Sequence, residues 1–399
     1  MEEIIRFATL AASGRFTMTE LCKDFGISRK TGYKQLRRYR AGGAQRLGPR
    51  SHRTGGCPHR TDAAVEQLIL TERRQHRTWG PKKLHVLLRT KHGIAVPPAR
   101  STIAAILHRH GLSERRRRRP GFYAVRPAEL TQPTHPNHVW TVDFKGWFLT
   151  GDGGRCDPLT VCDRYSRYVI GCQARPNQQF KGTLRVFKSL MRHHGLPEVI
   201  RVDNGTPFAS LGVGRLSQLS VWWINQGIVV EFTRPAHPQD NGAHERMHRD
   251  LKAEAMRPPS ANLPAQQRRF ERWQHEFNYE RPHEALAMQK PAELYHRSQR
   301  RLRENDTTIR YPSTHTVRRL STTGHLRHEG RNYYIGEALA ECRVGLLFNP
   351  TGQTEVHFAN VHLGNLVYDP AERFRPPAYI VPPDHKPLAN YPPKPKLKV

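Results

Sequence analysis

The sequence has 399 residues, and its 65 Lys and Arg against 34 Asp and Glu give a formal net charge of +31. Its hydrophobic fraction of 37% falls in periodic blocks, which excludes a disordered chain over most of the length. It has neither an apolar run of the roughly 18–20 residues that a membrane span needs nor a secretory signal pattern, so we expect a cytoplasmic protein without a membrane partner.

The excess of positive charge is concentrated near the N-terminus. Residues 1–130 contain 28 Lys and Arg and 9 Asp and Glu, so this third of the chain has a charge of 28 − 9 = +19. A strongly basic segment favours a polyanionic partner, and nucleic acid is the commonest one. The alternative is a basic surface that serves only solubility.

Residues 1–50 are predicted to form a helix-turn-helix DNA-binding domain. Helices are expected at the N-terminus, over Met18–Phe25 and from Ser28 to Tyr39, with Gly26 in the turn between the last two. In this motif the N-terminal residues of the last helix enter the major groove of DNA. The expected DNA contacts are Ser28, Arg29, Lys30, Tyr33 and Lys34. The alternative is a three-helix fragment with a solvated basic face.

Residues 60–112 are predicted to form a second helix-turn-helix domain, because three more helices with basic surfaces are expected there. Residues 113–134 are predicted to form a basic linker. We expect its run of five arginines to follow DNA phosphates, the alternative being a run that is only solvated. These residues are Arg115, Arg116, Arg117, Arg118 and Arg119.

Residues 135–300 differ in character from what precedes them. Three apolar segments of strand length, at His138–Leu149, Pro158–Cys162 and Arg167–Ala174, are followed by alternating helices and strands. This order predicts a mixed α/β sheet covered by helices, with a helical stretch over 263–303. Short strands within 310–370 predict a small C-terminal β-barrel, and the Pro- and Lys-rich residues 371–399 predict a flexible tail.

Three acidic residues are notable for their context. Asp143 lies within an apolar strand, where a charge is costly unless it is paired or binds a metal. Asp203 follows a predicted strand, and strand ends are favoured ligand sites in α/β sheets. Glu245 lies on a predicted helix, and the spacings are 203 − 143 = 60 and 245 − 203 = 42 residues.

Such a set of carboxylates suits phosphodiester chemistry. Converging carboxylates repel one another unless a cation neutralises them, and hard oxygen ligands favour Mg²⁺. Two ions would activate the attacking oxygen and stabilise the leaving oxygen. We therefore expect two Mg²⁺ ions, with Mn²⁺ as a substitute, held by Asp143, Asp203 and Glu245.

Four sequence segments around these acids resemble a known family. Trp140–Asp143, Val202–Gly205 and His237–Arg246 are similar to the integrase core of DDE insertion-sequence transposases, a core that also occurs in retroviral integrases, and Phe277–Leu286 is similar to the helix that follows it. The resemblance implies an RNase-H-like core with Asp143, Asp203 and Glu245 as the metal-binding triad. It covers about residues 1–370, including the tandem helix-turn-helix domains and the C-terminal β module.

The chain departs from the family in two respects. The second acidic spacing is longer than usual, which places extra residues around Leu211–Val221. The N-terminus lacks the paired His and paired Cys that bind zinc in retroviral integrases, so no zinc is expected.

The predicted function is that of an insertion-sequence DNA transposase, which binds terminal inverted repeats, cuts DNA strands and joins 3′-hydroxyls to target DNA. Double-stranded DNA would be its partner, it would act as a homo-oligomer, and DNA binding would place it in the bacterial nucleoid. Two alternatives are a catalytically silent DNA-binding regulator and an RNase-H-like nuclease that cuts without joining. Further phosphate contacts, or only a solvated basic face, are expected at Arg246, Arg249 and Lys252.

Overall fold

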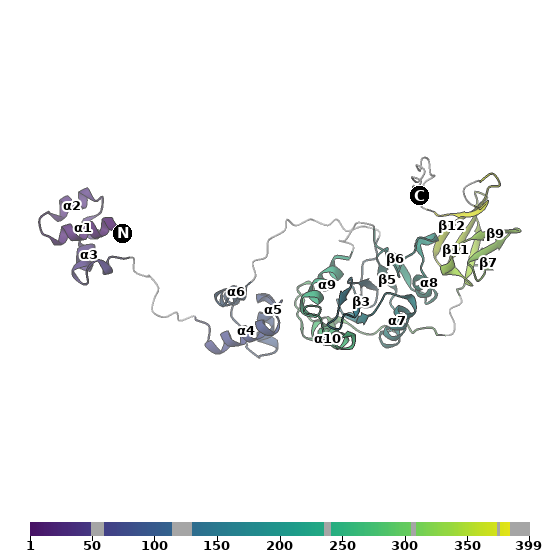
Figure 1. Cartoon of the computed structure of the whole chain (residues 1–399), viewed down its shortest axis with the longest axis horizontal. Helices are drawn as coiled ribbons and strands as arrows, with labels where there is room; N and C mark the ends of the chain where they lie inside the picture. Colours follow the sequence, from purple (N-terminus) through teal and green to yellow (C-terminus); the bar gives the residue numbers. More distant parts are fainter. Residues whose placement is uncertain (49–59, 114–129, 235–240, 305–308, 373–375, 384–399) are drawn as a thin grey trace. The chain divides into compact units, whose positions relative to one another are not determined.

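The structure, a computed structural model, describes residues 1–48, 60–113, 130–234, 241–304, 309–372 and 376–383 (Figure 1). The predicted contacts at Arg115–Arg119 lie outside these ranges, as does the His237–Asp240 part of the family motif. The chain divides into two compact units, Met1–Asp62 and Ala63–Val399. Within the described ranges, no helix has the length and apolar character needed to cross a membrane.

The first unit contains α1 (Glu2–Ala12), α2 (Met18–Asp24) and α3 (Arg29–Arg40). Their starts follow from capping: Thr17 and Glu20 form a reciprocal capping box at α2, and the Ser28 side chain accepts a hydrogen bond from the Thr31 backbone at α3. The helices enclose their own apolar core. A Cβ at Gly32 of α3 would lie 2.6 Å from the Cys22 sulfur, so only glycine permits this close helix approach.

The second unit begins with α4 (Ala63–Gln75), α5 (Pro81–Thr90) and α6 (Arg100–Arg109). Pro81 occupies the first position of α5, where its missing N–H costs nothing. The three helices pack around the fully buried Trp79. Their core is formed chiefly by Ile69, Leu84, Leu88, Ile103 and Leu107.

A mixed six-stranded sheet follows, with β3, β1, β5 and β6 as neighbours in that order and with β2 and β4 both paired to β3. The central strand β1 is antiparallel to β3 and parallel to β5, and β5 is parallel to β6. Strands β1, β3 and β5 are buried along most of their length, so both faces of the sheet centre are covered. The strands are β1 (Val139–Phe144), β2 (Phe148–Leu149), β3 (Arg155–Asp163), β4 (Val169–Arg175), β5 (Val199–Val202) and β6 (Val229–Phe232).

Helices cover both faces of this sheet (Figure 1). On one side, α7 (Phe180–His194) and α8 (Gln218–Asn225) contribute Phe187 and Trp223 to an apolar cluster with strand residues. On the other, α9 (Gly242–Glu254) and α10 (Leu263–His275) pack on Cys156, Cys162 and Cys172. The predicted helical stretch over 263–303 is shorter: a π turn at Glu276–Glu280 and the short α11 (Pro291–Leu294) follow α10.

The C-terminal strands do not form the predicted small β-barrel. They form an open five-stranded sheet of order β13-β12-β11-β10-β7, in which β7 and β13 are edges, and a separate β8–β9 hairpin. Leu326 and Tyr333 of the hairpin enter the same apolar core as the sheet, so the hairpin covers the sheet instead of extending it into a barrel. The strands are β7 (Thr316–Arg319), β8 (His325–His328), β9 (Arg331–Tyr334), β10 (Arg343–Phe348), β11 (Thr354–Phe358), β12 (Val361–Tyr368) and β13 (Ala378–Val381).

The segment predicted as a flexible tail, 371–399, contains the edge strand β13. Its four residues pair antiparallel with Asn365–Tyr368 of β12, which corrects the prediction for this part of the tail. Ala378 is buried in the sheet's apolar core. Residues 384–399 lie outside the described ranges.

The extra residues between the second and third acids, together with the rest of α8, form a bridge over Leu211–Asn225 to the C-terminal sheet. They contain a short 3-10 turn at Val213–Arg215 and α8. Leu216, Val221 and Ile224 are buried in the same apolar cluster as residues of the C-terminal sheet. At the turn, a Cβ on Gly214 would lie 3.1 Å from the Leu363 side chain of β12. The bridge and the C-terminal sheet therefore share an apolar core.

Candidate active site

Asp143 lies near the end of β1, the strand between β3 and β5. Its position opposite Thr160 of β3 is fixed by the antiparallel ladder. The preceding residues Val139–Val142 are buried, whereas the Asp143 side chain is 28% exposed. A rigid central strand thus holds this carboxylate at the rim of the core.

Asp203 and Glu245 reach the site from two other elements. Asp203 directly follows β5, is exposed, and its Oδ1 accepts a hydrogen bond from the Gly205 backbone at 3.1 Å. This contact stabilises the turn at the strand end. Glu245 is exposed in the first turn of α9, where a carboxylate is favoured by the helix dipole.

The pKa of Asp143 depends on burial and on the two other candidate acids. Burial, followed by the nearby Asp203 carboxylate and with a smaller effect from Glu245, raises the pKa of Asp143 to about 7, although Lys145 acts in the opposite direction. Both acids must therefore lie within electrostatic range of Asp143. The parallel register that pairs Thr141 with Arg201 ends β1 and β5 at the same edge of the sheet, so Asp143 and Asp203, each two residues further on, lie at that edge.

Comparison with protein families agrees with this arrangement. Two family models, both described as Integrase core domain, match residues 133–238 and 226–291. Together the two models span residues 133–291, the region that we call the integrase core. A Helix-turn-helix domain model matches residues 5–55 and a Homeodomain-like domain model matches 31–107, which confirms the predicted helix-turn-helix character of the N-terminal region.

Two curated proteins are similar in sequence to the chain. An uncharacterized 31.7 kDa protein of insertion element IS407 from Burkholderia multivorans is 26% identical over 221 residues, which cover 55% of this chain and 76% of that protein. The Pro-Pol polyprotein of feline foamy virus is 27% identical over 128 residues, or 32% of this chain and 10% of the polyprotein. The resemblance to insertion-sequence transposases with an integrase-like core is confirmed.

Solved structures of viral integrases were also matched. The HTLV-2 integrase catalytic core domain in complex with magnesium covers 41% of this chain and 100% of its own, with 16% identity and a TM-score of 0.33. A chain of the simian T-cell lymphotropic virus intasome, in complex with PP2A regulatory subunit B56 gamma, covers 74% of this chain and 97% of its own, with 15% identity and a TM-score of 0.37.

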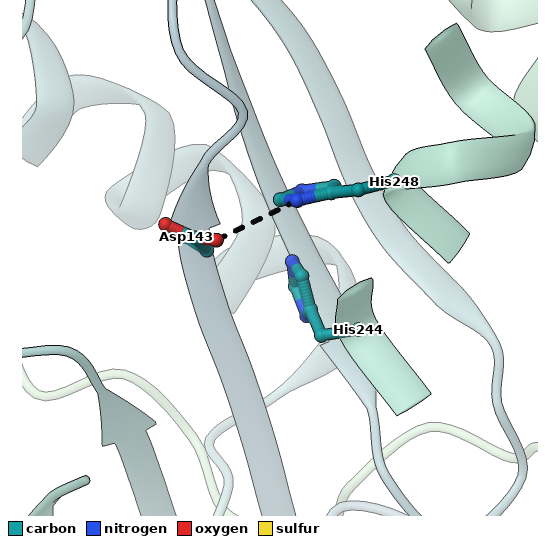
Figure 2. Close-up of side chains that lie close together, drawn as sticks. All are labelled: Asp143, His244 and His248. Atoms are coloured by element: carbon teal, nitrogen blue, oxygen red, sulfur yellow. Dashed lines mark ion pairs between the residues drawn. The ribbon is translucent and has the colours of Figure 1, made fainter. Parts of the chain in front are cut away.

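Two buried histidines of α9 lie beside Asp143 in the integrase core (Figure 2). His248 Nδ1 is 3.5 Å from Asp143 Oδ2, and His244 lies beside it with the two rings at nearly right angles. Burial lowers the pKa of His244 to about 3, and the pKa of His248 is lowered further by burial and by its neighbours His244 and Lys145. Both rings are therefore neutral at pH 7.

A single hydroxyl joins these groups. Thr160 Oγ1 lies 2.7 Å from His244 Nε2, 2.6 Å from His248 Nε2 and 3.0 Å from the Asp143 carbonyl oxygen. The Thr160 hydroxyl has one proton, which it donates to the Asp143 carbonyl oxygen. Both histidine Nε2 atoms must therefore be protonated and donate to the Thr160 oxygen. The lone pair of His248 Nδ1 then faces the Asp143 carboxylate, and two facing lone pairs suit a proton or a cation between them.

Sequence reasoning did not identify this histidine pair. In the sequence, His244 and His248 are polar residues on a helix that otherwise reads as basic and solvated. Their spacing of four residues places them on one helix face, together with the buried Leu251 one turn later, and this was the available signal. Asp163, the last residue of β3, is structural: it is fully buried and accepts hydrogen bonds from the backbone N–H groups of Asn137 and Ser166.

The predicted DNA contacts in the described residues are all exposed. Ser28 caps α3, and Arg29, Lys30, Tyr33 and Lys34 lie along the exposed side of that helix. On the integrase core, Arg246 and Arg249 of α9 line a cleft beside α5, whereas Lys252 is exposed but is not part of its lining. The further cations of this cleft are Arg73, Arg77, Lys82, Lys83 and Arg281.

Proposed function

We propose that the protein is an insertion-sequence DNA transposase that cuts the ends of its element and joins their 3′-hydroxyls to target DNA. The observation that carries this proposal is the match of residues 133–291 to integrase core domain models, and the placement of Asp143 and Asp203 at one edge of its sheet supports it. The similarity to a protein of insertion element IS407 supports an insertion element as the source of the DNA substrate.

Divalent metal ions fit the donor set of this site. The three carboxylates supply the hard oxygens that Mg²⁺ prefers, and their mutual repulsion is relieved by a cation. Asp143, Asp203 and Glu245 would hold two Mg²⁺ ions, for which Mn²⁺ is a substitute. When bound, such ions activate the attacking oxygen and stabilise the leaving oxygen of an in-line transfer.

The protein's own residues have three tasks in this reaction. The central strand fixes the position of Asp143. His248, itself bonded to Thr160, limits the orientations of the Asp143 carboxylate on the side that faces the core. The exposed Asp203 and Glu245 can adjust to the DNA substrate because neither is packed into the core. Because His244 and His248 beside Asp143 are neutral, they add no positive charge that would repel a metal ion.

The basic cleft between α5 and α9 is suited to the DNA backbone. Burial in this cleft, with a smaller effect from Arg281, lowers the pKa of Lys83 to about 8, although nearby carboxylates act in the opposite direction. Phosphate contacts of this kind position DNA without reading its sequence. Reading of the terminal repeats is assigned to α3 and the second helical group, and joining of two ends implies a homo-oligomer on DNA.

The test is a strand-joining assay with the inverted repeats that flank the gene and a supercoiled target plasmid. Asp203→Asn and Glu245→Gln should each reduce joined product by about a hundredfold or more in Mg²⁺. Both residues are exposed, so these variants should fold and bind DNA normally. The control Glu271→Gln removes an exposed carboxylate from α10 and should join DNA at the wild-type rate.

The outcome also separates the alternatives. Cut ends without joined product would identify a nuclease, and DNA binding without either product would identify a regulator. Near-normal joining by either variant would remove that residue from the triad.

A further inference from the structure

The C-terminal sheet gathers three metal-ligating side chains far from the acidic triad in the sequence. Glu355 and His357 are two residues apart in β11 and therefore point to the same face. His362 of β12 is the direct partner of His357 in the antiparallel ladder, which places it on that face too. One ligand atom from each of the three residues lies within 4.8 Å of the other two.

Within the described part of the chain, the hydrogen bonds of this cluster leave a buried nitrogen without a partner. Glu355 accepts from the Asn349 side chain at 3.0 Å through one oxygen and lies 3.0 Å from His357 Nε2 through the other. The His362 ring stacks on the His357 ring at 4.9 Å. Its Nε2 is buried, yet among the described residues it has no hydrogen-bond partner. A buried polar atom of this kind calls for a ligand.

We propose that Glu355, His357 and His362 form a binding site for a divalent transition-metal ion, with zinc as the best match. Two imidazoles and one carboxylate are ligands that Zn²⁺ accepts, and a fourth position would be left to water. Mg²⁺ prefers oxygen ligands and is a poor match for two imidazoles. A site here revises the expectation of no zinc, which was based on the N-terminus alone.

The position of the site indicates a structural role. A metal ion would link β11 to β12 on the face opposite Val356 and Phe358, which are buried in the apolar core. Leu363, next to His362, contacts the turn at Gly214. The ion would therefore stabilise β12, the strand that the bridge contacts at Gly214.

The experiment uses the full chain, stripped of metal with a chelator and free of DNA. Asp143→Asn serves as the background, so that binding at the triad does not obscure the result. Addition of Zn²⁺ should raise the melting temperature by about 5 °C, and Co²⁺ should give the visible absorption of a low-coordinate nitrogen-ligated site. The double variant His357→Gln with His362→Gln should show neither effect.

A matched pair of histidines provides the control. His325→Gln with His328→Gln removes two half-buried histidines from β8 of the same module and should keep both responses. Glu355→Gln preserves the contact with Asn349 and should weaken Zn²⁺ binding by tenfold or more. Absence of both metal responses in the Asp143→Asn protein would overturn the proposal, and so would equal responses in the His357/His362 variant.

Discussion

At the scale of single residues, the site combines one constrained carboxylate with two exposed ones. Asp143 is held by its strand and by the His248–Thr160 contact, whereas Asp203 and Glu245 face solvent. Thr160 is the residue on which this difference depends, because it bonds both histidines and the backbone of Asp143.

Replacing Thr160 by Val should reduce strand joining by about 10–100-fold at limiting Mg²⁺, since groups that orient metal ligands typically contribute that much. DNA affinity should stay unchanged. The control Thr183→Val removes another fully buried threonine hydroxyl, which bonds only within α7. If both variants lose joining equally, the Thr160 effect is one of stability and not of positioning.

His194 links the stability of the integrase core to pH. Burial, with smaller effects from His193 and Arg297, lowers the pKa of His194 from 6.5 to about 4. The unfolded chain therefore takes up a proton at this residue at a higher pH than the folded protein. The free energy of unfolding is therefore unaffected by His194 above about pH 6.5, and it decreases progressively as the pH falls from there toward 4.

The expected loss from this residue between pH 7.5 and 5 is about 2 kcal/mol. His194→Asn, which keeps a polar atom for the Tyr295 hydroxyl, should make the unfolding free energy less dependent on pH over this range. Urea unfolding at several pH values measures this slope. The control His296→Asn replaces an exposed histidine and should retain the wild-type slope. A wild-type slope in His194→Asn would contradict the role given to His194.

At the scale of elements, the sequence predicted what depends on local pattern. The helix-turn-helix helices and strands β1, β3, β4, β5 and β6 follow from apolar periodicity, capping residues and Gly-containing turns. The three acids of the proposed triad could be singled out because they interrupt the apolar patterns of strands or lie within segments that resemble the family's motifs. Burial of His244 and His248 could not, since it depends on which strands α9 covers.

The C-terminal module was predicted less well for the same reason. Barrel closure depends on pairing between edge strands that are distant in sequence, and no local pattern encodes it. The edge strand β7 is exposed at all four positions, and β13 lies in a Pro-rich segment, so neither has a clear apolar alternation. The long spacing between the second and third acids revealed extra residues around Leu211–Val221. Their contact with the C-terminal sheet could not be predicted, because it forms only when the chain folds.

The bridge supplies a test at this scale. Ile224 of α8 is 4% exposed and is buried in the cluster shared with the C-terminal sheet. Ile224→Ala should lower the free energy of unfolding by about 2–5 kcal/mol, the usual cost of such a cavity. Leu211→Ala, in the same bridge but fully exposed, should change it by no more than about 0.5 kcal/mol. Urea denaturation of both variants provides the comparison.

At the scale of the whole molecule, the net charge of +31 implies DNA binding with a strong salt dependence. Each phosphate contact on duplex DNA contributes a slope of about 0.9 in a plot of log K against log salt concentration. The exposed Arg246 and Arg249 line the cleft beside α5, so their share of this slope can be measured separately.

Changing both arginines to Gln should reduce the slope by up to about 2 and weaken binding to specific and random duplexes alike. The control changes Arg268 and Arg272, an exposed pair on α10 that is not part of the cleft lining, and should leave the slope unchanged. Equal slopes for the two double variants would mean that the cleft does not contact phosphates.

The shared core of α8 and the C-terminal sheet affects what becomes of damaged copies of the gene. A reading frame that stops before residue 309 would encode all three acids but would leave Leu216, Val221 and Ile224 uncovered. Proteins with exposed apolar cores are removed by cellular proteases. Under the proposed function, such a fragment would not accumulate, and it would therefore not occupy DNA ends that it cannot join. A late nonsense mutation should therefore silence its own copy without inhibiting intact copies in the same cell.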